Sequence, residues 1–215
     1  MLVLDGMPGC GKTTRLGALR RQCPDAVVFP EAQPPDGADE HAVLRALMGE
    51  DYARTQAARQ LAEHEPHCTV ASDRSHLGVL AYRYAHARLT GSWADFEHAL
   101  TYTSVLDQRH HDDIVLILHL DPAESVRRRG DPAASADRFW PWFDSAFLRA
   151  YGEFWYHLDQ WVTLGPRWSH HHADDPAVDA TLRALLSDAP RSSAFPRQSW
   201  AGNCRAAAIV SRPSR

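Results

Sequence analysis

A glycine-rich segment near the start of the sequence combines residue types that bind phosphate groups. It runs Gly6-Met7-Pro8-Gly9-Cys10-Gly11-Lys12-Thr13-Thr14 and matches the pattern GxxxxGK[ST]. Glycines allow the backbone to approach a ligand closely, so that successive N–H groups can surround phosphate oxygens. Lys12 would add a positive charge at the β- and γ-phosphates, and the hydroxyl of Thr13 would bind Mg²⁺. We therefore expect ATP and Mg²⁺ at this segment. The residues expected to contact the nucleotide are Gly6, Gly9, Cys10, Gly11, Lys12, Thr13 and Thr14.

The basic residues of the chain favour this interpretation. Of the 23 lysines and arginines, Lys12 is the only lysine. Arginine stands at every other basic position, and its planar fork would not fit the phosphate cradle. The alternative is a chance match in a glycine-rich turn. The flanking sequence argues against it, because an apolar run precedes the segment and helical spacing follows it.

Such a segment must join a strand to a helix, and the rest of the chain continues that alternation. Apolar runs predict strands at residues 1–5, 26–31, 67–72, 114–120 and 161–164. Helical spacing and start signals predict helices that begin at residue 12 and span residues 39–64 with a break at Gly49, 77–84, 93–108, 122–129, 139–158 and 175–186. Asp121 and Pro122 are typical of a helix start.

This alternation predicts an α/β fold: a doubly wound, five-stranded parallel sheet with helices on both faces. Ligands of such sheets bind at the carboxyl ends of the strands, where the glycine-rich segment, Glu31, Asp73 and Asp121 all fall. We expect one domain over residues 1–188. Residues 189–215 contain no acidic residue and predict a disordered tail.

Composition limits the classes of function. A net charge of −4 and a pI near 6.3 disfavour a general nucleic-acid binder or a membrane-surface protein. The four cysteines show neither CxxC nor zinc-type spacing, and we see no signal peptide or long apolar span. We therefore expect a reduced, cytoplasmic protein whose partner is a small-molecule phosphoryl acceptor. A homodimer is compatible with the sequence.

The chain resembles the P-loop nucleoside and nucleotide kinases, in particular the thymidylate kinase and deoxynucleoside kinase group. Besides the glycine-rich segment, the run from Ser72 to Tyr82 is similar to the thymidylate kinase segment that begins Asp-Arg-Tyr. Its Asp-Arg-Ser opening also resembles the Glu-Arg-Ser motif of deoxynucleoside kinases. Arg127 to Arg129, followed by Asp137-Arg138-Phe139, resembles the arginine-bearing lid of thymidylate kinases. The resemblance therefore implies a three-layer P-loop NTPase fold with a helical lid at about 127–140. Two residues depart from the pattern: Trp140 stands where that family often has Glu, and Arg83 stands where it has Gln.

The resemblance implies roles for several side chains. Asp73 would hold Mg²⁺ directly or through water, although an aspartate there could simply cap a helix. Arg74 would hold the acceptor or the transferring phosphate. Arg127 and Arg138 are the preferred lid arginines, while a helix end alone would also favour Arg127 electrostatically.

Glu31 bears on the nature of the acceptor. A hydroxyl must lose its proton, so a nearby carboxylate is useful as a general base. An acceptor phosphate needs no base and would be repelled by that carboxylate. Glu31 therefore favours a hydroxyl acceptor, as in deoxynucleoside kinases, whereas the Asp73-Arg74 segment and the lid favour thymidylate kinase.

Other polar and aromatic groups are open to two interpretations. Gln56, Arg59 and Gln60 could read a base edge or simply face solvent, and Tyr82 and Tyr84 could stack on an acceptor or belong to the core. Two clusters suggest metal ligands: His110-His111-Asp112-Asp113 and His170-His171-His172 with Asp174-Asp175. We expect both to be solvated loops, because contiguous ligands have poor geometry for one ion.

The leading hypothesis is an ATP- and Mg²⁺-dependent kinase that transfers the γ-phosphoryl group to a nucleoside or nucleoside monophosphate. One alternative is a kinase of another hydroxyl-bearing molecule, such as an antibiotic or a sugar. A non-enzymatic alternative is an ATP-binding regulatory module. A switch GTPase is excluded, because its Asn-Lys-x-Asp motif needs a second lysine.

Overall fold

Five parallel strands form the centre of the molecule, as predicted. The computed structural model describes residues 1–35, 37–65, 68–130 and 140–187. The strands are β1 (Leu2–Gly6), β2 (Val27–Phe29), β3 (Val70–Asp73), β4 (Ile114–His119) and β5 (Trp168–His172), in the spatial order β2-β3-β1-β4-β5. β1 lies in the middle and is fully buried, whereas β2 and β5 at the edges are only partly covered. The apolar run over residues 26–31, which suggests a buried strand, therefore forms a half-buried strand at the edge of the sheet.

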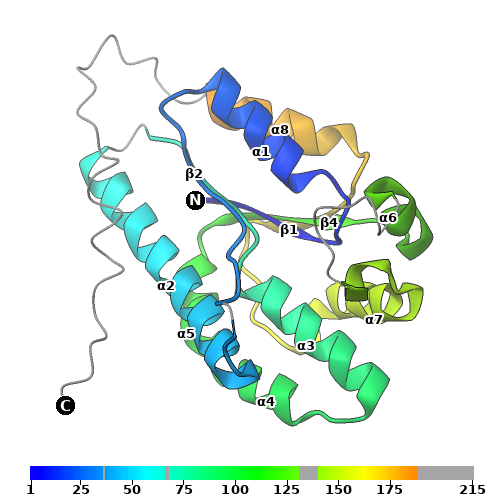
Figure 1. Ribbon diagram of the computed structural model, residues 1–215. Coiled ribbons are helices and arrows are strands. Elements are labelled where there is room, and N and C mark those ends of the chain that lie inside the picture. The colour runs from blue at the N-terminus through cyan, green and yellow to red at the C-terminus, as the bar shows by residue number, and fades with distance from the viewer. Residues whose placement is uncertain (36, 66–67, 131–139, 188–215) are drawn as a thin grey trace, which may run out of the picture.

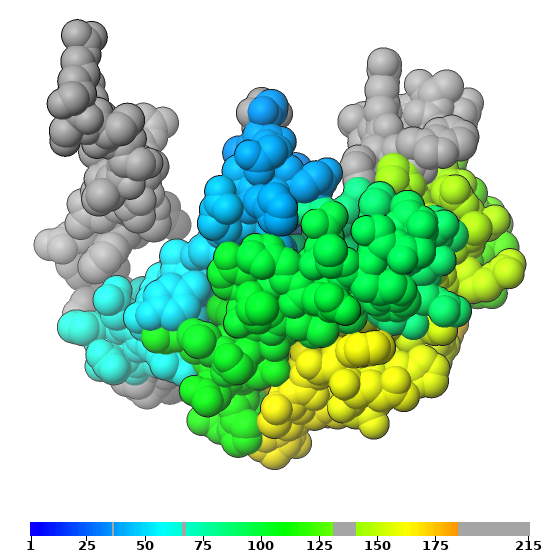
Figure 2. All heavy atoms as spheres, turned by 90° about the horizontal axis from the view of Figure 1, so that it is seen from below, coloured from blue at the N-terminus to red at the C-terminus, as the bar shows by residue number. Residues whose placement is uncertain are grey.

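Helices cover both faces of the sheet. They are α1 (Lys12–Gln22), α2 (Glu40–His64), α3 (His76–Thr90), α4 (Ala94–Leu100), α5 (Thr103–His110), α6 (Pro122–Arg129), α7 (Ser145–Tyr156) and α8 (Pro176–Ser187), with short 3-10 turns at Trp140–Phe143 and Leu158–Gln160. Figure 1 shows α1 and α8 on one face and α2, α3, α5 and α7 on the other. Figure 2, which views the second face, shows α2 to α5 as a continuous surface beside the segment that follows α7.

Two predicted helices differ from the observed ones in their continuity. The helix over residues 39–64 is continuous through Gly49, because Leu44, Met48 and Ala58 bury one face on both sides of the glycine. The predicted helix over residues 93–108 is two helices. At their junction the hydroxyls of Thr101 and Thr103 bond to backbone carbonyls three residues earlier, which competes with a regular helix.

The fifth strand lies later than predicted. Residues 161–164 follow a 3-10 turn, and the indole of Trp161 packs against Tyr84 and Phe96 instead of extending the sheet. Residues 168–172 pair with β4. An edge strand has one side near solvent, so its histidines are tolerated there. The expectation that His170 to His172 form a loop is therefore wrong.

The helix predicted over residues 139–158 is shorter. Asp144 accepts hydrogen bonds from the N–H groups of Ala146 and Phe147, so α7 begins at Ser145. An aromatic core joins α7 to α3 and α4, and it includes Tyr84, Phe96 and Phe154. Within the described part of the chain, no helix is long and apolar enough to cross a membrane, and Cys10, Cys23 and Cys68 are free thiols. Cys204 and the predicted tail lie outside the described residues.

Candidate functional site

The glycine-rich loop connects β1 to α1 at the carboxyl edge of the sheet. Gly6, Gly9 and Gly11 have φ angles of 108°, 75° and 78°, which favour glycine. A side chain on Gly6 would meet the carbonyl oxygen of Leu118 at 2.2 Å. Gly11 precedes the first turn of α1 without a side-chain cap. The unpaired N–H groups of this turn therefore remain available to an anion.

Lys12 lies inside this loop. Its side chain is buried, and Nζ donates to the carbonyl oxygens of Gly6 at 3.1 Å and Met7 at 2.7 Å. Nζ also lies 3.4 Å from Sγ of Cys10. The ammonium group is thus held at the centre of the loop, where an incoming phosphate would meet it.

Thr13 and Asp73 come together from neighbouring elements. β1 pairs with β3 so that Leu4 lies opposite Asp73, which places Asp73 beside the loop. Oγ1 of Thr13 donates to Oδ2 of Asp73 at 2.6 Å. Oδ1 of Asp73 is buried and has no hydrogen-bond partner among the residues described. Hard oxygen ligands of this kind fit Mg²⁺. The helix-cap alternative for Asp73 is wrong, because Ser75 caps α3.

Arg74 contacts the loop, where its Nη1 lies 3.4 Å from the carbonyl oxygen of Gly6, and two other parts of the chain. It lies directly after β3, next to the end of β2, and its Nε is 2.5 Å from a carboxylate oxygen of Glu31. Its Nη1 donates to the hydroxyl of Tyr151 at 2.9 Å, and its guanidinium lies 5.7 Å from the ring centre of Trp142. The structure therefore brings together Glu31 and Arg74, two residues that the sequence placed 43 positions apart.

The charged and polar groups around Arg74 favour its protonated form. Burial alone would lower the pKa of Arg74, but Tyr151, Glu31, Asp5 and Asp73 raise it above its ordinary value, so the guanidinium stays charged. Asp5, in the middle of the sheet, is fully buried and accepts from the N–H of Gly6 and from the N–H and hydroxyl of Ser75. Burial raises the pKa of Asp5, while Arg74 and Lys12 act in the opposite direction.

Arg127, one of the two preferred lid arginines, does not contact the loop through any hydrogen bond or ion pair among the described residues. Arg127 is exposed and pairs with Glu124 of its own helix, and Arg128 bridges Glu124 and Asp174. Helix α6 itself contacts the loop, because Ser125 Oγ donates to the carbonyl oxygen of Pro8 at 2.8 Å. Arg138, and with it most of the lid predicted over residues 127–140, lies outside the described residues.

Several other candidates lie elsewhere. Arg59 donates to the carbonyl oxygen of Arg109 and lines a small hollow with Met1, at the amino end of β1. Of the two interpretations of Arg59, this favours the solvent-facing one. Gln56 contacts Tyr52 on the same helix. Tyr84 belongs to the aromatic core, whereas Tyr82 lies next to Trp142.

Sequence reasoning missed Asp5, Trp142 and Tyr151 as neighbours of the loop and of Arg74. Asp5 carries a usable signal, because it is a charged residue inside an otherwise apolar strand. Trp142 and Tyr151 look like ordinary core aromatics, and only tertiary packing brings them to Arg74.

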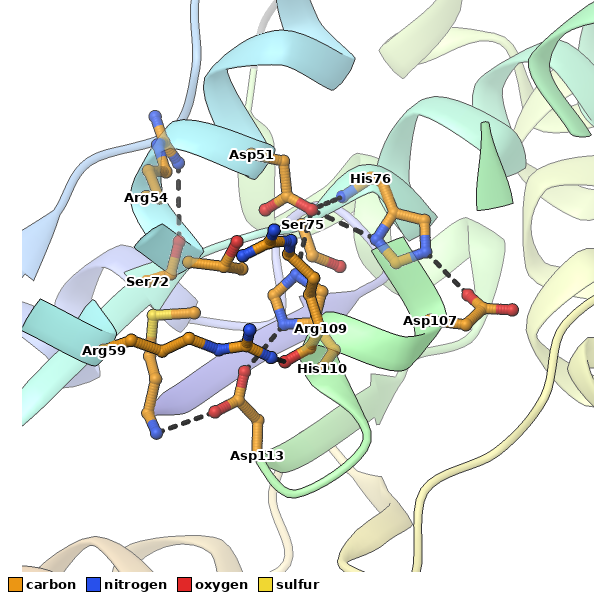
Figure 3. Close-up of polar contacts among 12 residues, drawn as sticks. Asp51, Arg54, Arg59, Ser72, Ser75, His76, Asp107, Arg109, His110 and Asp113 are labelled. Atoms are coloured by element: carbon orange, nitrogen blue, oxygen red, sulfur yellow. Dashed lines mark hydrogen bonds and ion pairs between the residues drawn. The ribbon is translucent and has the colours of Figure 1, made fainter. Parts of the chain in front are cut away.

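A buried network of histidines and aspartates lies beneath the site (Figure 3). Oδ2 of Asp51 lies 3.1 Å from Nδ1 of His76 and 2.9 Å from Nε2 of His110. The second nitrogen of His76 lies 3.0 Å from Asp107, and that of His110 lies 2.8 Å from Asp113. The solvated-loop interpretation is therefore wrong for His110 and Asp113.

The possible ligand atoms of Asp51, His76 and His110 are close enough together to suggest a metal site. However, every ring nitrogen of His76 and His110 faces a carboxylate. The neighbouring carboxylates raise the pKa of both histidines against the effect of burial, which favours rings protonated on both nitrogens. Each ring can then donate to two carboxylates, so charged hydrogen bonds account for the cluster without an ion. The exposed pair His111 and Asp112 does face solvent, as predicted.

Comparison with known proteins identifies the fold of this chain. No model of a known protein family matches the chain, and no curated protein sequence does. Among solved structures, deoxyadenosine kinase from M. mycoides with bound dATP superposes with a TM-score of 0.55 at 14% identity, covering 86% of this chain and 97% of that one. The same enzyme with bound dCTP gives a TM-score of 0.50 at 14% identity, covering 87% and 100%. The chain therefore shares its fold with this deoxyadenosine kinase.

Proposed function

We propose that the protein is an ATP- and Mg²⁺-dependent kinase that phosphorylates a hydroxyl group of a nucleoside. One observation carries the proposal. The loop after β1 carries Lys12 and the Thr13–Asp73 pair, and Arg74, the residue after Asp73, is ion-paired with the carboxylate of Glu31. Because Arg74 also donates to the carbonyl oxygen of Gly6 at 3.4 Å, it joins the donor site to the candidate base.

Each residue has a distinct task. The loop N–H groups and Lys12 bind the triphosphate, and Thr13 and Asp73 hold the cation. When bound, Mg²⁺ neutralises charge on the phosphate oxygens. Glu31 accepts the proton of the attacking hydroxyl. Arg74, fixed by Tyr151, orients Glu31 and attracts the transferring phosphoryl group, and Arg127 and Arg138 move onto the phosphates when the lid closes.

The Glu31–Arg74 pair favours a nucleoside over a nucleoside monophosphate. An acceptor phosphate would have to compete with Glu31 for Arg74 and would be repelled by the carboxylate. The deoxyadenosine kinase with the same fold binds dATP and dCTP, which supports a nucleoside as the acceptor class. We further propose that residues 1–188 form the catalytic unit and that it acts in the cytoplasm on small molecules only.

The test is a panel of acceptors with labelled ATP: deoxynucleosides, nucleoside monophosphates, aminoglycosides and simple sugars. We expect phosphorylation of at least one nucleoside, and only with Mg²⁺ present. Phosphorylation of the monophosphates alone would contradict the assigned acceptor, and turnover of an antibiotic or sugar alone would contradict a nucleoside kinase. Tight ATP binding with no acceptor turned over would indicate a regulatory module.

The variant Lys12→Ala tests the donor site. We expect turnover to fall by about 10²- to 10³-fold with the fold intact, because a positive charge at the developing phosphate charge is lost. Arg183→Ala, on the exposed surface of α8, is the matched control. Full activity of Lys12→Ala would overturn the proposal.

A further inference from the structure

We propose that Asp51, a buried residue of α2, is a positioning residue for the turn that presents Asp73 and Arg74, and that His76 and His110 keep it in place. The inference deepens the proposed function and rests on it. Asp51 touches neither the loop nor Arg74 in the structure, so its action would be indirect.

The turn after β3 needs support from outside. Arg74 has a φ of 69°, and it is the only non-glycine residue with a positive φ in the described part of the chain. A non-glycine residue in this region costs about 1 kcal/mol or more and persists only when its surroundings hold it there. The same turn carries both the candidate metal ligand and the candidate phosphate-binding guanidinium.

Hydrogen bonds hold the turn on both sides. On the sheet side, the N–H of Arg74 donates to the carbonyl oxygen of Leu4 at 2.9 Å, and Asp5 accepts from Ser75. On the helix side, Oδ2 of Asp51 accepts from the backbone N–H of His76 at 3.1 Å and faces Nδ1 of the same residue, also at 3.1 Å. Asp51 thus fixes the first residue of α3, two positions after Arg74.

Asp51 is itself held by charge. It is 4% exposed, and its Oδ2 also faces Nε2 of His110 at 2.9 Å. His76 and His110 each have a second carboxylate behind them, Asp107 and Asp113. Burial opposes ionisation of Asp51, but the two histidines outweigh it and hold the pKa of that carboxyl well below its usual range.

The supporting groups come from every element that packs around Asp51. His76 belongs to α3, Asp107 and His110 to α5, and Asp113 precedes β4. The amino group of Met1, which precedes β1, donates to Asp113 at 2.7 Å. The negative groups Asp51, Asp107 and Asp113 face the positive groups His76, His110 and the Met1 amino group. Loss of the proton on His110 therefore leaves Asp51 buried with weaker compensation.

Asp51→Asn tests this step, because asparagine keeps the shape and an acceptor for the His76 N–H while removing the charge. We expect kcat to fall by about 10²-fold, as for a displacement of about 1 Å, with a much smaller change in KM for ATP. Burial lowers the pKa of His110, but Asp51 and Asp113 outweigh it and raise that pKa to about 9. Wild-type activity should therefore persist with rising pH until His110 loses its proton. In Asp51→Asn this alkaline step should disappear, because residue 51 then carries no buried charge that needs the proton of His110.

Two further variants make the test specific. His110→Gln removes one of the two histidines that face Asp51 and should reproduce the loss in kcat. It therefore tests the proposal even if Asp51→Asn does not fold. His111→Gln alters the neighbouring exposed histidine, which pairs only with Asp112 among the contacts described, and should leave the rate and its pH profile unchanged. An unchanged kcat and pH profile in folded Asp51→Asn would overturn the proposal, as would neutral imidazoles of His76 and His110 in ¹⁵N NMR spectra at pH 7.

A readout independent of phosphoryl transfer separates this inference from the proposed function. We would measure ATP affinity with and without Mg²⁺. In Asp51→Asn the gain in affinity from Mg²⁺ should shrink, because Asp73 is displaced. If no acceptor is phosphorylated but this gain still shrinks, the proposed function fails and the positioning role stands. An unchanged gain would overturn the positioning role whether or not the protein is a kinase.

Discussion

Asp73 and Arg74 are neighbours in the chain, yet their side chains contact different parts of the fold. Asp73 ends β3 and faces Thr13, whereas Arg74, with its positive φ, contacts Glu31 and Tyr151. The local motif and the strand order predict that the glycine-rich segment and Asp73 lie at one edge of the sheet, and the structure places them there. The contact of Arg74 with Tyr151 depends on how α7 packs, and no local pattern encodes it.

Thr13 is the residue at which dependence on the cation can be tested. Thr13→Val keeps the shape but removes the hydroxyl that contacts Asp73. The substitution removes one proposed oxygen ligand of Mg²⁺. We expect Mg²⁺-dependent turnover to fall at least tenfold, which corresponds to about 1.4 kcal/mol in the activation free energy. Thr13→Ser should restore most of the activity. The measurement is the rate against Mg²⁺ concentration, and equal curves for wild type and Thr13→Val would contradict the role.

Gly6 should be the glycine least tolerant of change. Gly6→Ala would place a methyl group 2.2 Å from the carbonyl oxygen of Leu118 at a φ of 108°. Backbone would have to move, so we expect a loss of more than about 3 kcal/mol in the free energy of unfolding. Urea unfolding measures it. Gly17→Ala, in the interior of α1 with ordinary contact distances, is the control and should not destabilise the protein.

At the scale of elements, the differences between prediction and structure arise where tertiary packing decides. Helix α2 runs through Gly49 because burial on both sides outweighs the weak propensity of one glycine. β5 forms from three histidines because β4 offers it an unpaired edge. By contrast, the strand at 114–119 and the start of α6 were predictable, since a continuous apolar run and an Asp-Pro cap are strong local signals.

The continuity of α2 gives an element-scale prediction. A side chain on Gly49 would meet nothing within 4 Å. Gly49→Ala should therefore raise the free energy of unfolding by about 1 kcal/mol, because alanine favours the helix over the unfolded chain. Gly91→Ala is the matched control. It also has open space, but its φ of 77° at the end of α3 should make the same substitution destabilising. Thermal unfolding of both variants decides, and a destabilised Gly49→Ala would mean that α2 bends there.

At the scale of the whole molecule, the buried network joins segments that are far apart in the sequence. It links the amino terminus before β1, helices α2, α3 and α5, and the start of β4. Removing one member would leave a buried charge without its partner, which typically costs about 3–5 kcal/mol. Charged groups that are buried and paired in this way make folding itself dependent on pH.

The sign of that dependence follows from His110. Its pKa is about 9 in the folded protein against an ordinary value of 6.5, so the folded state binds the proton more tightly than the unfolded state. The resulting stability is fully present below pH 6.5 and is lost as the pH rises through about 9. From this difference we expect the free energy of unfolding to fall by about 3 kcal/mol over that interval. Urea unfolding at pH 6, 7, 8 and 9 measures the slope. His110→Gln should flatten it, whereas His111→Gln should keep it, and a wild-type slope near zero would mean that His110 is neutral in the folded protein.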